Sequence, residues 1–350
     1  MNFLFLYTEL ADYFLHCCSQ LSKHGTVHIV RWPVNKEAPF NFQFPDNIKV
    51  YDKDKYDLEG LKKLLLQINP SVIICSGWID KDYLKLVKPY FKKIPTVLTC
   101  DTHWNGSLKQ YLAVILSRVF LLNKFSHAWV PGKPQAKYVK KLGFKSRNIK
   151  TNYYCCDLPK FNALYDVQHS KKQIAFPKRF LYVGRYYNFK GITDLWSAFS
   201  KVQEELPNEW ELWCLGTGNI PPFEHPKIKH FGFVQPKDLE PILLQSGVFI
   251  LPSRFEPWGV VVQEYAAAGF PMLLSTNVGA AEMFLEEGGN GFTFKSQNIK
   301  ELADLLKKII YLRDEELLKM SVKSNELAQK INSADWVKTI TNIIDEQRKK

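Results

Sequence analysis

The chain has 350 residues, which is enough for two domains of ordinary size, and apolar residues make up 46% of it, which excludes extensive disorder. No apolar run is long enough to span a bilayer. The formal net charge is +12, and residues 1–165, with 24 Lys and Arg against 12 Asp and Glu, carry the whole excess.

A basic first half attracts an anionic lipid surface, a nucleic acid or an acidic substrate. A solvated, Lys-rich surface without a target is the alternative. No recognised nucleic-acid recognition module accompanies the charge, so a nucleic-acid partner is not expected. Peripheral contact of this half with an anionic membrane remains as a hypothesis.

Short apolar runs and amphipathic stretches alternate through the first half, which predicts a parallel, doubly wound α/β sheet. The predicted strands are 3–7, 26–31, 48–51, 72–75, 96–99 and 128–130, and the predicted helices lie near 10–23, 58–67, 81–92, 107–123 and 133–142. The helix around 111–122 is apolar almost all round, and we expect it to pack under the sheet. The alternative is a position in a membrane interface, with Lys109, Arg118 and Lys124 around it.

A polar, Lys-rich stretch at 168–172 is interpreted as a linker between two domains. A second alternation of strands and helices follows it. Its predicted strands are 180–183, 210–215, 228–231, 248–251, 272–275 and 291–294, and its predicted helices lie near 191–205, 237–245, 260–268, 279–286, 298–311 and 314–331. The predicted domains are therefore 1–165 and 166–332, both Rossmann-like, with a final helix within 333–350 that returns to the N-terminal domain.

The seven cysteines form two adjacent pairs and three single residues, at positions 17, 18, 75, 100, 155, 156 and 214. This spacing provides neither a CxxC site nor a disulfide framework, so reduced structural thiols are expected. The N-terminus also lacks the basic flank and continuous apolar core of a secretory signal. Together with the lack of a membrane-spanning run, this observation predicts a cytoplasmic protein.

The most informative stretch is 255–264, in which Glu256 and Glu264 stand eight positions apart around a Pro-Trp-Gly turn. A buried strand precedes it and a helix follows. The N-terminus of such a helix presents free N–H groups that bind a phosphate, and a carboxylate beside it can hold sugar hydroxyls. The alternative is an ordinary loop in which Glu256 is only a charge at a helix start.

Three further turns follow strands of the second half. Gly184 and Arg185 lie at the end of one strand, and Lys190 stands five residues later, so two cations are available to neutralise a diphosphate unless both are simply solvated. A Gly-Thr-Gly turn begins at Gly216, and it is not a dinucleotide fingerprint because Pro221 occupies the position of the third glycine. Phe233 and Val234 follow another strand, where they are suited to hold a flat base.

In this order the motifs resemble those of the family-4 retaining glycosyltransferases of GT-B fold. The resemblance covers about residues 175–310 and includes the two glutamates, the Gly-Arg and Lys-Gly turns and the glycines near 269–291. It implies two Rossmann-like domains that face each other across a cleft, with the acceptor bound by the first and the nucleotide-sugar by the second.

The resemblance also implies roles for individual residues. Arg185 and Lys190 would hold the departing diphosphate, Glu256 the donor sugar, and Glu264 the ribose. His103, which follows a strand of the first half, would reach toward the donor sugar; the alternative is a surface His that caps the helix at 107. The other donor-binding residues implied are Gly184, Gly216, Phe233, Val234, Pro257, Trp258, Gly259 and Val260.

No metal is expected, because the cations and the helix N-terminus would hold the diphosphate. Asp52-Lys53-Asp54 matches an Asp-x-Asp string, but it lies in a charged segment and is interpreted as solvated. The loop after the first strand lacks the glycines that are frequent there in the family, so Thr8 and Glu9 are assigned toward the acceptor instead.

The sequence thus predicts a metal-independent, retaining hexosyltransferase without a cofactor. Its donor would be a nucleoside-diphosphate sugar, a UDP-sugar rather than a GDP-sugar, and its acceptor a saccharide or a lipid-linked molecule in polysaccharide or glycoconjugate synthesis. The alternatives are a sugar-nucleotide epimerase or phosphorylase of the same fold and a non-catalytic GT-B subunit that positions a partner enzyme.

Overall fold

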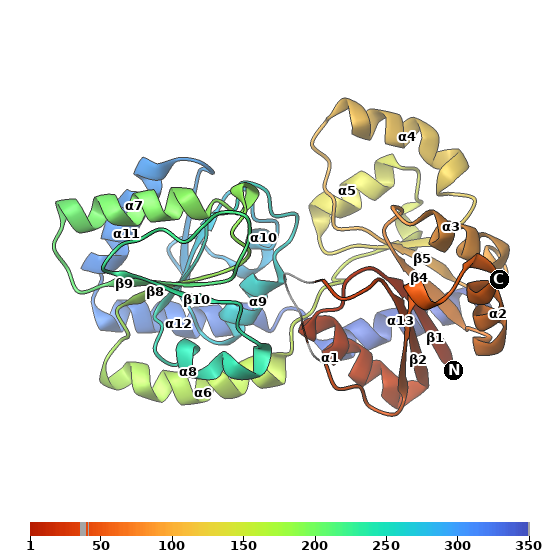
Figure 1. Cartoon of the computed structure of the whole chain (residues 1–350), viewed down its shortest axis with the longest axis horizontal. Helices are drawn as coiled ribbons and strands as arrows, with labels where there is room; N and C mark the ends of the chain where they lie inside the picture. Colours follow the sequence, from red (N-terminus) through yellow and green to blue (C-terminus); the bar gives the residue numbers. More distant parts are fainter. Residues whose placement is uncertain (36–39, 41, 349–350) are drawn as a thin grey trace. The chain divides into compact units, whose positions relative to one another are not determined.

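The computed structural model describes residues 1–35, 40 and 42–348. The chain divides into two compact units. Unit 1 comprises Met1–Cys156 together with the chain from Ile331 onward, and unit 2 comprises Asp157–Lys330. Each unit is a parallel sheet covered by helices (Figure 1), as the alternation of apolar runs predicted.

Unit 1 contains a seven-stranded sheet in the order β3-β2-β1-β4-β5-β6-β7, and every pairing is parallel. Its strands are β1 (Asn2–Tyr7), β2 (Thr26–Arg31), β3 (Ile48–Asp52), β4 (Val72–Ser76), β5 (Thr96–Thr99), β6 (His127–Trp129) and β7 (Ile149–Lys150). Its helices are α1 (Asp12–Leu21), α2 (Leu58–Ile68), α3 (Lys81–Val87), α4 (Leu108–Phe120), α5 (Lys133–Lys141) and α13 (Ser333–Arg348). The two-residue strand β7 was not predicted, because it is too short to show an apolar pattern.

The last helix, α13, lies in unit 1 although it comes after the whole of unit 2, and it packs beside α1. Trp336 is buried in this contact, with its ring stacked on that of Phe5 at a centroid distance of 6.1 Å. The indole Nε1 donates a hydrogen bond of 2.7 Å to the carbonyl of Tyr153, so the polar end of the ring is satisfied as well.

Unit 2 contains a six-stranded parallel sheet in the order β10-β9-β8-β11-β12-β13. Its strands are β8 (Arg179–Val183), β9 (Glu211–Leu215), β10 (Ile228–Gly232), β11 (Val248–Leu251), β12 (Met272–Ser275) and β13 (Gly291–Phe294). Its helices are α6 (Leu158–Ile174), α7 (Ile192–Glu205), α8 (Glu240–Leu243), α9 (Val260–Ala267), α10 (Ala281–Phe284), α11 (Ile299–Tyr311) and α12 (Asp314–Ala328). Helices α7 and α11 pack together on one face of the sheet, and α6, α9 and α12 pack together on the other (Figure 1).

The stretch interpreted as a linker, 168–172, is helical and belongs to α6. The division between the units falls before Asp157, whose side chain accepts a hydrogen bond of 3.2 Å from the N–H of Lys160 and so caps α6. Gln168, which is fully buried, donates to the carbonyls of Leu243 and Ser246. The polar stretch is therefore part of a helix that buries Gln168 and Lys172 and exposes Ser170 and Lys171, and it is not a linker between domains.

Helix α4 corrects a second expectation. We predicted that this apolar helix packs under the sheet, but most of its large apolar side chains are exposed, with Leu108 at 82% and Ile115 at 70%. Its buried positions in the described chain are Gln110 and Ser117, which are polar.

Candidate functional site

The predicted donor-site residues follow the carboxyl ends of the strands of unit 2. Strands β8 and β11 are neighbours in the sheet. From β8 the chain adds β9 and then β10 on one side, and it then crosses over to form β11 on the other side of β8. The carboxyl edge at such a reversal of strand order is where open α/β sheets bind ligands. The loop after β8 carries Arg185 and Lys190, and the loop after β11 carries Glu256.

Lys190 and Glu256 form an ion pair, although they stand 66 positions apart in the chain. The Nζ of Lys190 lies 2.5 Å from Oε2 of Glu256, and the hydroxyl of Ser253 donates to the same oxygen at 3.2 Å. Glu256 is 9% exposed and Ser253 is fully buried. A carboxylate so shielded from water needs a partner of this kind, because an unpaired buried charge is strongly destabilising. The pair thus places a cation and an anion side by side at the edge of the sheet.

Close contact between the backbones brings the two loops together. Gly191 has φ +67°, and a Cβ atom there would lie 2.1 Å from the carbonyl oxygen of Pro252. The N–H groups of Arg254 and Phe255 both donate to the carbonyl of Phe189, at 2.8 and 3.1 Å. Glycine at 191 is therefore required by its φ angle and by the proximity of the facing loop.

Arg254 adds a side-chain link that the sequence analysis missed. Its guanidinium binds Asp194 through Nε at 2.9 Å and Nη2 at 2.6 Å, and its Nη1 donates to Oδ1 of Asn188 at 2.6 Å. Asp194 stands in the first turn of α7 and is buried. This bidentate pair ties the start of α7 to the loop of Glu256, and the carboxylate raises the pKa of Arg254. No local pattern pairs residues 60 positions apart, so this contact could not be predicted from the amino-acid sequence.

The loops after β8 and β9 are also joined. Gly216 has φ +138°, and a Cβ atom there would lie 1.9 Å from the carbonyl oxygen of Gly184. The hydroxyl of Tyr182 donates to the carbonyl of Arg185 at 2.9 Å. Burial, together with the nearby Glu256, raises the pKa of Tyr182 well above its usual range, so the phenol stays protonated as a donor. These contacts hold the backbone of Arg185, whose side chain is half-buried.

The N-terminus of α9 faces the same edge of the sheet. Its N-cap is Gly259, with φ +93°, and no side chain caps the helix in the described residues. The preceding turn is fixed by the N–H of Ala280, which donates to the carbonyl of Trp258 at 2.9 Å. The indole of Trp258 is buried beside Phe284, so only the backbone of this residue is available to a ligand. The first N–H groups of α9 are therefore suited to an anion.

The other predicted residues lie around this arrangement. Glu264 is half-buried on α9, one turn beyond the Val260 start, and half-buried Phe233 and Val234 follow β10. Two strands separate β10 from β11, so these two residues lie farther along the same edge. Pro257 belongs to the turn before Trp258, and its carbonyl closely faces Gly279.

His103 belongs to unit 1, whereas the residues predicted to bind the diphosphate, the ribose and the base belong to unit 2. It lies in the loop between β5 and α4, and its carbonyl accepts a hydrogen bond of 2.7 Å from Nε2 of Gln110. The N-cap of α4 is Ser107. The backbone carbonyl of His103 thus contacts the first turn of α4.

Asp52 and Lys53 in the Asp-x-Asp string are engaged in ion pairs. Asp52 binds Arg31 and Lys55, both at 2.9 Å, and these cations lower its pKa. Lys53 lies 2.5 Å from Asp80. Within residues 1–35, 40 and 42–348, no group of three or more His, Cys, Asp and Glu side chains is arranged to hold a metal ion. All seven cysteines are free and buried, as expected.

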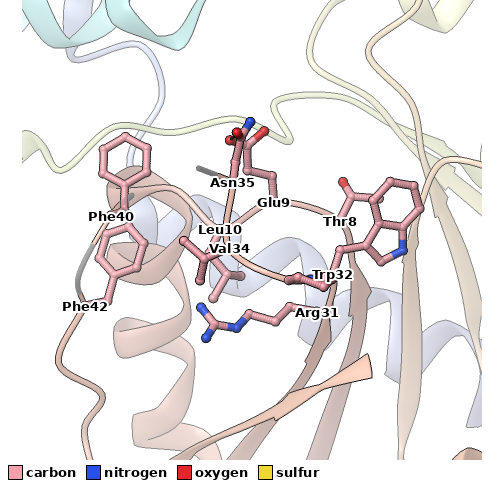
Figure 2. A pocket seen from close by; sticks show the side chains of 10 residues that line it. Thr8, Glu9, Leu10, Arg31, Trp32, Val34, Asn35, Phe40 and Phe42 are labelled. Carbon is pink, nitrogen blue, oxygen red and sulfur yellow. Dashed lines mark hydrogen bonds between the residues drawn. The ribbon is translucent and has the colours of Figure 1, made fainter. Parts of the chain in front are cut away.

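A small pocket lies at the carboxyl ends of β1 and β2 in unit 1 (Figure 2). Thr8 and Glu9, which we assigned toward the acceptor, line it together with Arg31 and Trp32. The indole of Trp32 donates to Asp80 at 2.7 Å, which fixes one wall. The cavity volume is about 20 Å³, which is room for a single water and not for a sugar ring.

The chain matches a protein family and several curated proteins over part of its length. Residues 177–311 match the family described as glycosyl transferases group 1. An uncharacterized glycosyltransferase of Methanocaldococcus jannaschii is 31% identical over 120 residues, which are 31% of this chain and 30% of that protein. The glycogen synthase of Mycobacterium tuberculosis is 28% identical over 143 residues, which are 38% of this chain and 34% of that protein. The match therefore spans about a third of the length of these relatives.

Solved structures are similar over the whole chain. Sucrose-phosphate synthase of Thermosynechococcus elongatus superposes with a TM-score of 0.72 and 15% identity, over 99% of both chains. HepE of Anabaena, solved in complex with UDP, superposes with a TM-score of 0.73 and 15% identity, over 99% of this chain and 100% of that one. The chain thus has the GT-B fold, and its residues 177–311 match the family described as glycosyl transferases group 1.

Proposed function

We propose that the chain is a family-4 retaining glycosyltransferase that transfers a hexosyl group from a nucleoside-diphosphate sugar to an acceptor hydroxyl. The observation that carries the proposal is the ion pair between Lys190 and Glu256 at the edge of the sheet, beside the N-terminus of α9. A diphosphate needs cations and N–H donors, and a sugar needs a carboxylate. This edge of unit 2 supplies all three.

The ion pair has a chemical consequence for the reaction. When a donor binds, Lys190 exchanges its carboxylate for the diphosphate, and Glu256 accepts hydrogen bonds from the sugar hydroxyls instead. Lys190 and Arg185 then stabilise the negative charge that develops as the bond between the anomeric carbon and the phosphate oxygen breaks. Glu264 holds the ribose, and Phe233 and Val234 lie along the base.

Retention is proposed through a front-face reaction. The acceptor oxygen bonds to the anomeric carbon on the face from which the diphosphate departs, and the proton of the acceptor hydroxyl passes to the departing phosphate oxygen. No protein nucleophile and no metal take part in this step. His103 would orient the donor sugar from unit 1.

A UDP-sugar is the proposed donor. HepE was solved in complex with UDP, and a structure of trehalose-6-phosphate from E. coli holds UDP-2-fluoro glucose, which supports the choice. The catalytic domain of starch synthase IV from Arabidopsis thaliana was solved with ADP, so the base requires a direct comparison. The proposed acceptor is a saccharide or a lipid-linked molecule of polysaccharide or glycoconjugate synthesis. A cytoplasmic location is proposed, with the seven free cysteines as its support.

The decisive experiment measures nucleotide release from a panel of UDP-, GDP- and ADP-sugars, with the product analysed by NMR for its anomeric configuration. We expect a UDP-sugar to be consumed, the configuration to be retained and the rate to persist in a chelator. Inversion would exclude the retaining mechanism, and complete loss of the rate in chelator would mean that a metal is required. Release of an isomerised sugar nucleotide would identify an epimerase, and no turnover with any donor would favour the non-catalytic subunit.

A further inference from the structure

Helix α4 of unit 1 buries polar side chains and exposes apolar ones, which is the reverse of a helix that packs on a hydrophobic core. Its buried residues are Gln110 and Ser117, which hydrogen-bond to the protein backbone: Gln110 binds the loop of residues 103–106, and Ser117 donates to the carbonyl of Leu142 at 2.7 Å. The large apolar side chains are exposed instead, by 49–82% of their surface. They are Leu108, Tyr111, Leu112, Ile115, Leu116, Val119 and Phe120.

The exposed apolar side chains form a continuous surface along α4. Leu108, Leu112, Ile115 and Val119 recur at intervals of four, three and four residues, which places them in one stripe of an α-helix. At 3.6 residues per turn, the exposed Lys109 and Arg118 fall at the opposite edges of this stripe. An apolar stripe bordered by cations is the arrangement found in helices that lie in the plane of a membrane interface.

The surroundings of α4 carry a strong positive charge. Residues 83–156 contain 14 Lys and Arg and a single acidic residue, Asp101. Helix α5 contributes four of these cations, and one of them, Lys141, lies over the ring of Trp104 at 4.7 Å. Trp104 in turn packs edge-on against Tyr111 at 4.9 Å. The basic surface of α5 is therefore continuous with the apolar stripe of α4.

The charge decides between the possible occupants of this surface. A second copy of the chain would bring two strongly basic surfaces together, and like charges repel at such a contact. An anionic bilayer offers both an apolar interior for the stripe and negative headgroups for the flanking cations. Among the described residues, no helix is long and apolar enough to cross a membrane, so the contact would be at its surface.

We propose that α4 is a membrane-docking helix, which inserts its apolar stripe into the interface of an anionic bilayer while the basic residues of α4 and α5 contact the headgroups. The proposal does not depend on the glycosyltransferase activity. Because α4 begins directly after the loop of His103, docking would hold the carboxyl edge of the unit 1 sheet beside the bilayer, where a lipid-linked acceptor would be presented.

The test is flotation of the full chain with vesicles of phosphatidylcholine, either pure or with about one third phosphatidylglycerol. We expect binding to the anionic vesicles, weaker at high salt, and little binding to the neutral ones. The variant L112E/I115E should bind roughly 100-fold more weakly, because two apolar side chains no longer enter the interface. The matched control L66E/I174E makes the same change at two other exposed positions, 72% and 90% exposed, and should bind within about twofold of the wild type.

Circular dichroism and thermal melts establish that both variants are folded. Absence of wild-type binding at low salt, or equal weakening in the two double variants, would overturn the proposal. If the wild type instead forms a dimer and does not bind vesicles, and L112E/I115E is a monomer, the surface would be assigned to self-association. Because the natural cysteines are all buried, I115C can be labelled selectively with an environment-sensitive dye, whose emission should shift to the blue on anionic vesicles, whereas a dye on L66C should not respond.

Discussion

At the scale of individual residues, the proposed chemistry depends on the ion pair between Lys190 and Glu256. Each side chain satisfies the charge of the other, at a distance of 2.5 Å. In the proposed reaction, donor binding would exchange this ion pair for contacts of Lys190 with the diphosphate and of Glu256 with the sugar, and both groups are already held at the edge of the sheet where those contacts form. Ser253 supports the carboxylate from the side, and its own carbonyl accepts a hydrogen bond from Ser275.

Removal of either partner should lower turnover strongly, and K190A should also destabilise unit 2, because it leaves the buried carboxylate of Glu256 without its cation. We expect K190A and E256A each to lower kcat by about 10²–10³-fold, because each removes a group that acts on the transition state. The measurement is nucleotide release at saturating donor. The control is K171M, which changes an exposed lysine on α6 and should leave kcat unchanged. Near-normal kcat in both alanine variants would contradict the assigned site.

Lys172 is a second residue with an unusual environment. It is 2% exposed, its Nζ donates to the carbonyl of Gly269 at 2.9 Å, and the rings of Phe270 and Phe176 lie 4.5 and 5.1 Å away. Burial lowers its pKa to about 7. The unfolded chain, in which the pKa is near 10.5, therefore binds more protons than the native state between pH 7 and pH 10.5.

This difference predicts a pH dependence of stability. Because the native state gains stability as pH rises from 7 toward 10.5, K172M should stabilise the chain at pH 7 and progressively less at higher pH. Over this pH range, the free energy of unfolding of the wild type relative to K172M should change by a few kcal/mol, because a shift of one pKa unit corresponds to about 1.4 kcal/mol. The carbonyl of Gly269 stays satisfied by Ser321 in the variant. Urea unfolding at several pH values, with K171M as the control, measures the effect, and an unchanged pH profile in K172M would refute it.

At the scale of elements, the site depends on how α7 and the loop after β11 are fastened together. Arg254 links the two through Asp194 and Asn188, and Gly191 allows their backbones to touch. Neither Asp194 nor Arg254 is assigned to the substrate. Their contribution is to hold Lys190 and Glu256 in the same place.

Loss of the Asp194 carboxylate should therefore loosen the site. D194A should lower the free energy of unfolding by about 1–3 kcal/mol. This loss is smaller than that expected for a fully buried ion pair, because the guanidinium of Arg254 can be hydrated in the variant. Its KM for donor should rise more than its kcat falls, since the variant changes the position of the binding groups and not their chemistry. D194N, which keeps a hydrogen-bond acceptor, should recover part of both effects. A D194A enzyme with wild-type stability and KM would show that the link is dispensable.

At the scale of the whole molecule, the chain forms two parallel sheets, one in each unit, and its last helix belongs to the first unit. Helix α13 completes unit 1 after unit 2 has been made. Unit 1 therefore contains residues from both ends of the described chain, and its core cannot be complete until α13 is present.

A single substitution tests this dependence. W336A removes a buried indole from between α13 and the sheet, and it should destabilise unit 1 by about 3–5 kcal/mol, the usual cost of truncating a large core side chain to alanine. The exposed neighbour K338A should change stability by less than about 0.5 kcal/mol. Thermal unfolding of both variants gives the comparison. Equal melting temperatures would show that α13 is not part of the core of unit 1.

Local patterns were sufficient for most of the fold. Strands buried on both faces appear as short apolar runs, and amphipathic stretches between them mark the helices, so both parallel sheets were predicted. The turn residues around Glu256 and Lys190 were also visible, because their glycines and prolines are local signals. The pairing of Arg254 with Asp194 was not, because it depends on two loops that approach each other only after the sheet has formed.

Local composition gave the wrong prediction for two segments, because it does not show which groups their side chains contact in the folded chain. The polar residues at 168–172 suggested a linker, yet Gln168 and Lys172 are buried against backbone carbonyls. The apolar residues of α4 suggested a buried helix, yet they are exposed and the polar Gln110 and Ser117 are inside. Hydrophobicity alone does not distinguish a polar side chain that faces water from one that finds a carbonyl in the interior.

The order of apolar runs, turns and glycines in the amino-acid sequence determined the α/β class, the two sheets and the candidate residues of unit 2, because each of these signals is local in the chain. Only the tertiary structure decided that Lys190 meets Glu256, that Arg254 fastens two loops, that α6 begins unit 2 and that α4 turns its apolar side outward. Those four features are contacts between segments that the sequence separates, and they arise from the packing of the sheets rather than from any local preference.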